Sequence, residues 1–261
     1  MSIELRSKGS TRIITLNRAD KLNAFDEAMH LAFQEALDRV AQDPECRAVL
    51  LTGTGRAFSV GQDLAEVDPA RMDGPPELGR TIDRFYNPMI RKLRAIEVPV
   101  VCAVNGVAAG AGANIALACD LVLAARSARF IQAFAKIGLV PDSGGTWSLV
   151  RHLGPARAMA LALTGEPLSA EKAEAWGLIW RVVDDEALAE SALSLVDGLA
   201  QGPTHGLKLT KRALRAASEN GLDAQLDLER ALQDEAGRNP DYAEGIVAFM
   251  NKRPPQFTGG S

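Results

Sequence analysis

The central stretch of the chain, VPVVCAVNGVAAGAGANIALACDLVLAARSARF, limits the possible folds more than any other part. It predicts a buried strand from Val98 to Val104, a turn at Gly106, a small-residue helix from Gly110 to Cys119 and another strand from Leu121 to Ala125. Strand, helix and strand follow one another at short intervals, which is typical of layered α/β structure. We therefore expect an α/β fold of stacked β-β-α units.

Shorter patterns extend this prediction toward the amino terminus. Ile3 to Leu5, Arg12 to Leu16 and Ala48 to Thr52 have the composition of strands. Between them, DEAMHLAFQEALDRVAQ has an apolar stripe at helical spacing and begins with Asp26, a residue type that caps helices. We expect an amphipathic helix that packs on the strands.

The pattern changes from about Gly202 onward. Leu207, Leu214, Leu222 and Leu226 belong to two apolar stripes at helical spacing, and a last helix is expected from Tyr242 to Lys252. A helical hairpin cannot bury such stripes by itself, so these helices should dock on the main domain or on another subunit. We divide the chain into a core over 1–201 and a helical region over 202–261.

Composition excludes several classes of protein. The 261 residues are 47% hydrophobic with a formal net charge of −4, which argues against a nucleic-acid surface. No apolar run reaches about 18 residues, and the opening lacks a secretory pattern, so we expect no membrane segment and a cytoplasmic location. The three cysteines have no CxxC spacing and the three histidines are scattered, so no metal site is expected.

Common catalytic motifs fit poorly. GVAAGAGANI has Ile115 where a dinucleotide fingerprint needs its third glycine, and no Walker lysine follows Gly106. AFSVG misses the nucleophile-elbow pattern at Ala57, which weakens the case for Ser59 as an esterase nucleophile.

Two glycine-rich turns have another possible use. SVGQDL and AAGAGAN each place a backbone N–H near the start of a helix, where such groups lack intrahelical partners. Two of these groups converging on one oxygen would form an oxyanion hole. The same glycines would also allow close packing of helix on strand, and spacing alone favours that simpler explanation.

The segment KIGLVPDSGGTW places an acid, Asp142, between a proline and a Ser-Gly-Gly turn. Turn formation explains these residue types simply, because Pro, Asp and Gly all favour turns. The alternative is a carboxylate directed into an apolar pocket formed by Ile137, Leu139 and Val140, which would raise its pKa toward that of a useful base.

Five segments together resemble one family, the crotonase (enoyl-CoA hydratase/isomerase) superfamily, in the family's order. They are NRADKLNAF, GRAFSVGQDL, AVNGVAAGAGANIALACDLVLAA, KIGLVPDSGGT and LTGEPLSAEKAEAWGLIWRVVDD. The resemblance implies a crotonase-type spiral of ββα units followed by a C-terminal helical trimerisation region. It also implies acyl-CoA substrates, no separate cofactor, and a homotrimer or a dimer of trimers.

The resemblance assigns roles to individual residues. The two oxyanion donors fall on the backbone N–H groups of Gln62 and Ala111, the latter where many relatives have glycine. Asn114 and Phe134 occupy the positions of the two glutamates of the hydratases, which argues against water addition. Asp142 is similar to the catalytic aspartate of the family's dienoyl-CoA isomerases, aromatic epoxide isomerases and haloaryl-CoA dehalogenases.

The same comparison implies a set of substrate and CoA contacts. Lys21, and Lys252 with Phe249 from a neighbouring subunit, are candidates for the CoA moiety. The remaining expected contacts are Ala24, Ala57, Ser59, Asp63, Leu64, Asn114 and Phe134.

The expected reaction is an isomerisation. Asp142 would remove a proton from the carbon next to the thioester carbonyl, and the two N–H groups would hold the enolate oxygen. The segments RSARF and QLDLERALQDEAGRNPDYAEGIVAFMNKRPPQFTG resemble the aromatic epoxide isomerases of the family, which favours a ring-epoxide substrate in addition to 3-enoyl thioesters. The alternatives are an aliphatic Δ3,Δ2- or dienoyl-CoA isomerase, a dehalogenase, and a non-catalytic acyl-CoA-binding subunit.

Overall fold

A computed structural model describes residues 1–66, 68, 70 and 74–260, and its strands form two sheets. The large sheet has the order β1-β2-β3-β5-β7-β10, and only β1 runs antiparallel to its neighbour. The small sheet has the order β4-β6-β8-β9, with β9 antiparallel. The bounds of the strands are β1 Ile3–Lys8, β2 Thr11–Leu16, β3 Ala48–Gly53, β4 Ala57–Ser59, β5 Val100–Val104, β6 Val107–Ala109, β7 Leu121–Ala125, β8 Arg129–Ile131, β9 Leu168–Ser169 and β10 Arg181–Val183.

Successive strands alternate between the two sheets. Strands β3, β5 and β7 belong to the large sheet, while β4, β6 and β8, which follow them in turn, belong to the small one. A helical segment follows each pair, which confirms the predicted spiral of ββα units. The helices are α1 Glu27–Gln42, α2 Leu78–Thr81, α3 Asn87–Ala95, α4 Ala111–Leu117, α5 Gly145–Thr164, α6 Ala170–Ala175, α7 Leu188–Ala200, α8 Thr204–Ala216, α9 Leu222–Gly237 and α10 Pro240–Met250.

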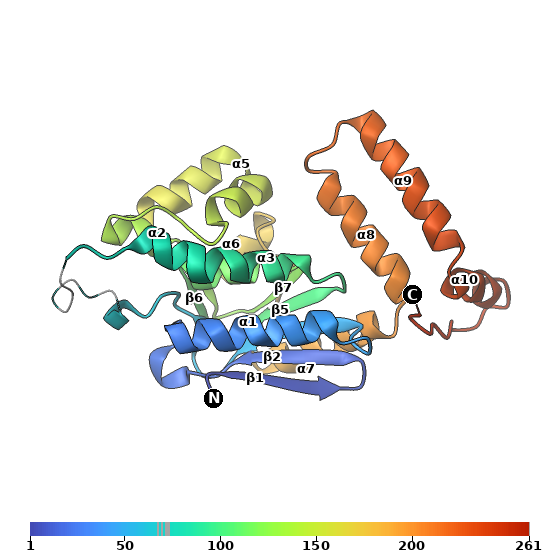
Figure 1. Ribbon diagram of the computed structural model, residues 1–261, viewed down its shortest axis with the longest axis horizontal. Helices are drawn as coiled ribbons and strands as arrows, with labels where there is room; N and C mark the ends of the chain where they lie inside the picture. Colours follow the sequence, from blue (N-terminus) through green and yellow to red (C-terminus); the bar gives the residue numbers. More distant parts are fainter. Residues whose placement is uncertain (67, 69, 71–73, 261) are drawn as a thin grey trace.

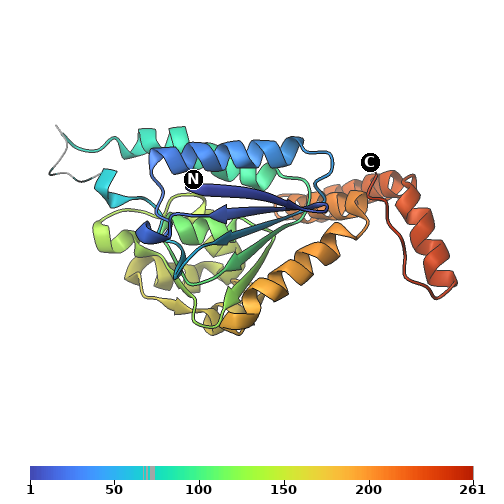
Figure 2. The same cartoon turned by 90° about the horizontal axis from the view of Figure 1, so that it is seen from below.

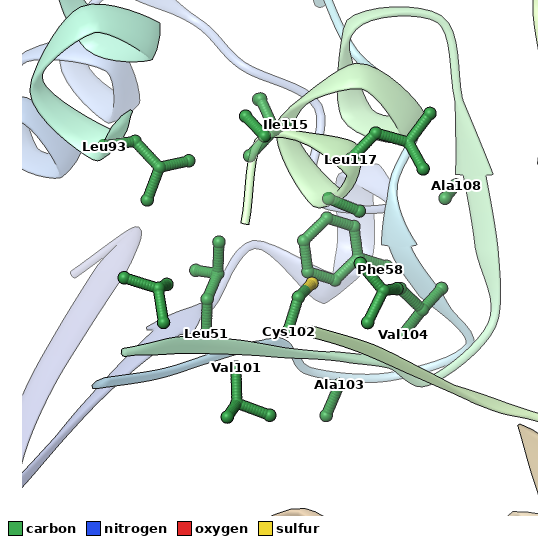
Figure 3. Packing of buried hydrophobic residues seen from close by; sticks show 14 of the residues in the cluster. Leu51, Phe58, Leu93, Val101, Cys102, Ala103, Val104, Ala108, Ile115 and Leu117 are labelled. Carbon is green, nitrogen blue, oxygen red and sulfur yellow. The ribbon is translucent and has the colours of Figure 1, made fainter. Parts of the chain in front are cut away.

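The core lies between the sheets and the helices around them. Figure 3 shows Leu51 and Cys102 pointing to one face of the large sheet, and Val101 and Ala103 pointing to the other. Because parallel strands buried on both faces need apolar residues at every position, β5 reads as the continuous run VVCAV. On one of these faces, the ring of Phe58 fills the space between the large sheet and α4.

Helix α1 begins and packs as its sequence predicts. The carboxylate of Asp26 accepts a 2.8 Å hydrogen bond from the N–H of Met29, so the cap is present. The apolar stripe of α1 is buried, and Figure 2 shows α1 and α7 on opposite sides of the large sheet. These helices keep the sheet covered, so the strand ends that carry the site are held on a rigid frame.

The three C-terminal helices stand beside the ββα core (Figure 1). The predicted apolar positions lie in α8 and α9, whereas the last helix begins at Pro240, where Asn239 caps it, and ends at Met250 instead of spanning Tyr242 to Lys252. Leu214, Leu222 and Phe249 are more than 70% exposed in the single chain. The division at 201/202 stays a prediction, as does the partner that covers these side chains. Among the described residues, none of the helices is both long and apolar enough to cross a bilayer.

Candidate active site

The loop after β4 presents the N–H of Gln62. Two hydrogen bonds join this loop to the segment before α1: Phe25 N–H donates to the Gly61 carbonyl at 2.7 Å, and Asp63 N–H donates to the Phe25 carbonyl at 2.9 Å. Successive N–H groups of an extended chain point to opposite sides, so the N–H of Gln62, between these two bonds, points away from Phe25. Gly61 has φ +83°, which glycine adopts without strain.

The start of α4 presents the N–H of Ala111. Gly110 precedes it with φ 53° and ψ −129°, a conformation open to glycine and strained for other residues. Ala111 is the first residue of the helix, so its N–H has no intrahelical acceptor and carries the positive end of the helix dipole. The alanine in place of the glycine of many relatives is compatible with this role, because the donor belongs to the backbone.

The two N–H groups lie on adjacent pieces of backbone. A Cβ atom placed on Gly61 would be 3.1 Å from the backbone nitrogen of Ala111. A Cβ placed on Gly112 would be only 2.3 Å from the carbonyl oxygen of Ser59, so α4 lies directly against the end of β4. The glycines therefore do allow close packing, as the simpler explanation held, and this packing is what brings the two donors together.

Asp142 sits in the turn before α5, and its main chain is held from two sides. Its carbonyl accepts hydrogen bonds from the N–H of Gly145 at 2.8 Å and from the side-chain amide of Asn114 at 2.9 Å. Its carboxylate accepts a 2.9 Å bond from the hydroxyl of Ser143, which has φ 51°. Burial raises the pKa of Asp142, and the Ser143 bond acts in the opposite direction.

A cavity of about 630 Å³ joins these groups. Its wall includes Gln62, Ala111 and Asp142, together with the three apolar residues predicted to surround the acid: Ile137, Leu139 and Val140. Those three side chains are exposed in the single chain, Val140 by 79%. The cavity is therefore an apolar space with a carboxylate and two N–H donors in its wall, an arrangement suited to removing a proton next to a carbonyl group.

Eight of the thirteen predicted site residues line this cavity: Lys21, Ala24, Gln62, Asp63, Leu64, Ala111, Phe134 and Asp142. Asp63 differs from Asp142 because Arg18 pairs with its carboxylate at 2.7 Å. The ring of Phe134 lies beside Gly110, 3.7 Å from the position of a Cβ on that glycine.

Three predicted contacts are buried behind the wall. Ala57 is a strand residue whose carbonyl accepts from Asn23, and the hydroxyl of Ser59 donates to the Asn23 carbonyl at 2.8 Å. Ser59 is fully buried, so it has the geometry of a structural hydroxyl. Asn114, also fully buried, uses its amide on Asp142 and accepts a 2.9 Å bond from Gln132.

Phe249 and Lys252 lie outside the cavity of their own chain. Phe249 is near the end of α10 and is 84% exposed, and Lys252 follows the helix. Figure 1 shows α10 on the far side of the molecule from α2, so their contact with CoA stays a prediction that requires a neighbouring subunit. Between residues 65 and 84, positions 67, 69 and 71–73 lie outside the described residues, whereas Leu78, Thr81 and Ile82 line the cavity.

Sequence reasoning missed Tyr86 and Lys136, which also line the cavity. Tyr86 ends a five-residue π-helical segment, Ile82–Tyr86, which turns its side chain inward. A wider helical turn has no sequence signature, so periodicity does not locate it. Lys136 belongs to the quoted segment KIGLVPDSGGT, and its charge beside the apolar run was the signal available.

The fold and this site are those of a crotonase-type enzyme, and comparison with known proteins agrees. The family model described as enoyl-CoA hydratase/isomerase matches residues 6–260, and the chain belongs to that family. It is 56% identical, over 94% of each chain, to a 1,2-epoxyphenylacetyl-CoA isomerase of Escherichia coli. It is 46% identical, over 95% of its length and 94% of the other, to a Rhodobacter capsulatus protein named "Probable enoyl-CoA hydratase".

A solved structure of the same family has the same fold. The crystal structure of a Mycobacterium abscessus protein named "putative Enoyl-CoA hydratase/isomerase" superposes with a TM-score of 0.95 at 37% identity, covering 98% of this chain and 99% of the other.

Proposed function

We propose that the protein is an acyl-CoA isomerase in which Asp142 is the base. Asp142 removes a proton from the carbon next to the thioester carbonyl, and the N–H groups of Gln62 and Ala111 hold the oxygen of the enolate. The proposal rests on the difference between the two carboxylates in the cavity wall, one of which is paired with a cation. Of the two carboxylates among the described lining residues, Asp63 is neutralised by Arg18, whereas Asp142 has a raised pKa and the Ser143 hydroxyl as its side-chain partner.

The proposed substrate is ring-1,2-epoxyphenylacetyl-CoA, and the product is an oxepin-CoA. Breaking the carbon–carbon bond between the two epoxide carbons expands the ring to an oxepin. In this oxepin a double bond joins the β- and γ-carbons of the thioester. Asp142 then takes the α-proton, the enolate extends to the γ-carbon, and protonated Asp142 returns the proton there. Atoms and electrons balance without another reactant. The 56% identity to an isomerase named for this substrate supports the assignment.

The same transfer converts a 3-enoyl to a 2-enoyl thioester. In both substrates one proton moves from the α- to the γ-carbon, so one base and one oxyanion hole are sufficient. An aliphatic Δ3,Δ2- or dienoyl-CoA isomerase remains the alternative substrate assignment, and a non-catalytic acyl-CoA-binding subunit is the alternative without chemistry.

Hydration is disfavoured by the site, although one relative carries a hydratase name. Water addition by the family's usual pair needs two glutamates, and the corresponding positions hold Asn114 and Phe134. Asn114 is fully buried, with its amide bonded to Gln132 and to the main chain of Asp142, so it is not free to activate water.

Coenzyme A is part of the substrate, and we propose no separate cofactor. The amines of Lys21 and Lys136, both in the cavity wall, are suitable partners for its phosphates. Phe249 and Lys252 would reach the same CoA from a neighbouring subunit of a homotrimer or a dimer of trimers.

The deciding experiment supplies ring-1,2-epoxyphenylacetyl-CoA and a 3-enoyl-CoA separately in deuterated water. The expected products are the oxepin thioester and the 2-enoyl thioester, identified by mass and ultraviolet spectrum, with deuterium at the γ-carbon only to the extent that protonated Asp142 exchanges its proton with the solvent before returning it. Asp142→Asn is the matched control, because Asn forms the same turn but cannot accept the proton. Full activity of this variant would remove Asp142 from the mechanism, and wild-type protein that converts neither thioester would contradict the proposed function.

A further inference from the structure

The phenol of Tyr86 is buried, yet it forms part of the cavity wall. Its side chain is 2% exposed, at the end of the π-helical segment Ile82–Tyr86. The hydroxyl donates a 2.9 Å hydrogen bond to the side-chain oxygen of Gln62, the residue whose backbone N–H faces the thioester in the proposed function. Burial and the charge of Asp142 both raise the pKa of Tyr86, so the phenol stays protonated and remains a donor beside the base.

An imidazole without hydrogen bonds lies behind Tyr86. His30 is 1% exposed, and neither of its ring nitrogens has a hydrogen-bond partner among the described residues. Its ring stands edge-on to Tyr86, with 4.4 Å between centroids, and stacks on Phe85. Burial lowers the pKa of His30 to about 4, so at neutral pH it is uncharged and keeps one N–H. A buried N–H without a partner is costly and requires an explanation.

Gln62 shares a cavity wall with each of these two side chains. It lines the cavity that contains Tyr86 and also a second cavity whose wall includes His30. The imidazole of His30 also packs edge-on against Tyr86, whose hydroxyl is bonded to the oxygen of Gln62, so the amide and the imidazole lie close together. Gln62 therefore has a second donor available for its oxygen if the hydroxyl of Tyr86 turns away.

We infer that Tyr86 is a specificity-determining residue that recognises an oxygen atom in the ring of the acyl group. When such a ring binds, the hydroxyl of Tyr86 leaves Gln62 and donates its hydrogen bond to the ring oxygen. The N–H of His30 then replaces the hydroxyl as the donor to the side-chain oxygen of Gln62, so the two donors exchange roles. The inference rests on the proposed function and deepens it, since it explains how one cavity favours an oxygen-containing ring over a hydrocarbon chain.

The chemistry of the wall suits this role. An ether or epoxide oxygen accepts hydrogen bonds and donates none, so it requires a neutral donor in an otherwise apolar space. Thr81 and Tyr86 are the hydroxyl side chains in the described wall, and the hydroxyl of Thr81 donates at 3.5 Å to the carbonyl of Glu77, the residue before its helix. A 3-enoyl chain has no such oxygen, so with it the bond from Tyr86 to Gln62 stays in place.

The first test measures affinity with two thioesters that cannot isomerise. Oxan-2-ylacetyl-CoA and cyclohexylacetyl-CoA differ by one ring oxygen, and calorimetry gives the ratio of their dissociation constants for each variant. Wild-type protein should prefer the oxygen-containing ring by about three- to tenfold, the worth of one net hydrogen bond. In Tyr86→Phe the preference should disappear. Because each variant provides its own ratio, a general loss of stability does not imitate this result.

Two further variants locate the donor. His30→Phe keeps an aromatic ring in the cluster but removes the N–H, and should reduce the oxygen preference. Thr81→Val should keep it. A preference that survives in Tyr86→Phe, or that disappears in Thr81→Val instead, would overturn the inference, and an unchanged preference in His30→Phe would overturn the exchange with Gln62.

Turnover provides the second test. Tyr86→Phe should lower kcat/KM for the ring-epoxide thioester about tenfold or more and change it less than about threefold for the 3-enoyl thioester. An equal loss with both substrates would contradict a role in oxygen recognition. Failure of the proposed function shows separately, as wild-type protein that turns over neither thioester, because the affinity ratio does not depend on catalysis.

Discussion

The side-chain amide of Asn114 donates a 2.9 Å hydrogen bond to the backbone carbonyl of Asp142, and so joins helix α4 to the turn that carries the proposed base. The oxygen of the same amide accepts a bond from Gln132, which is also buried. At the position where hydratases of the family have a glutamate, this chain therefore has a residue that positions the carboxylate. Asparagine in place of glutamate at position 114 thus removes one carboxylate from the site and supplies an amide that orients Asp142.

Asn114→Ala should lower kcat by about ten- to a hundredfold with little change in KM, because Asp142 stays present but loses a support of its main chain. The variant also leaves the amide of Gln132 without its partner, which should cost about 1 to 3 kcal/mol of unfolding free energy. Steady-state kinetics and urea denaturation measure the two effects. A kcat equal to that of wild type in folded protein would show that this hydrogen bond does not position the base.

Ser143→Gly should move the acidic limb of the pH–activity profile to higher pH. The hydroxyl of Ser143 donates to the carboxylate of Asp142 and acts to lower its pKa, so removing the donor raises that pKa further. Since the base must be ionised, activity then appears only at higher pH. Glycine fits the φ of 51° at this position, so the backbone turn is kept. A profile that stays in place, measured as kcat/KM against pH, would contradict the contact.

Local patterns allowed much of the fold to be predicted. Helix α1 combines an Asp26 cap with one apolar face, and the central strand β5 is a continuous apolar run, so local sequence determines both elements. The two N–H donors, those of Gln62 and Ala111, were assigned through the resemblance to the crotonase family, because glycine spacing alone favoured simple packing of helix on strand. What local pattern could not supply was the packing of α4 on the end of β4, which involves residues some fifty positions apart.

The remaining features depend on contacts across the fold. Asn114, Gln132 and Asp142 come from three different elements, so no window of sequence contains their hydrogen bonds. Tyr86 reaches the cavity through a π-helical turn, and His30 belongs to an apolar stripe in which an imidazole looks like any core residue. Residues that support a site through tertiary contacts carry no sequence signal of their own.

Gly112→Ala should reduce activity much more than an ordinary Gly-to-Ala change in a helix. A Cβ at this position would be 2.3 Å from the carbonyl oxygen of Ser59, so α4 must move away from β4 and separate the N–H groups of Ala111 and Gln62. Loss of one oxyanion donor lowers kcat by about a hundredfold or more. Gly206→Ala in α8 is the matched control, because its Cβ meets nothing closer than 4.0 Å. Equal activities of the two variants would show that this packing does not set the site.

The exposed apolar side chains of the C-terminal helices should be covered by other copies of the chain. Leu226→Asp, on α9, should therefore convert an assembly of three or six chains into smaller species, as measured by light scattering. Asp234→Asn, an exposed polar change on the same helix, should leave the mass unaltered. Wild-type protein with the 27.8 kDa mass of one chain would contradict the predicted homotrimer or dimer of trimers.

Asp142→Asn should melt at a higher temperature than wild type at neutral pH, although it loses activity. Burial raises the pKa of Asp142 above its ordinary value, so the folded state binds the proton more tightly than the unfolded state does. The stability that comes from the neutral form is fully present below the ordinary pKa and is lost as pH rises through the raised pKa of the folded protein. Asparagine imitates the neutral form at every pH.

The measurement that checks this prediction is the difference in Tm between Asp142→Asn and wild type from pH 8 downward. The difference should be positive at pH 8 and should shrink as the pH falls through the raised pKa, where Asp142 in the wild type becomes protonated. Asp63→Asn is the control, because the carboxylate of Asp63 pairs with Arg18 at 2.7 Å and its loss should lower Tm at neutral pH. A difference for Asp142→Asn that is negative at neutral pH would mean that the ionised carboxylate stabilises the fold, and burial would then not be the dominant influence on the proposed base.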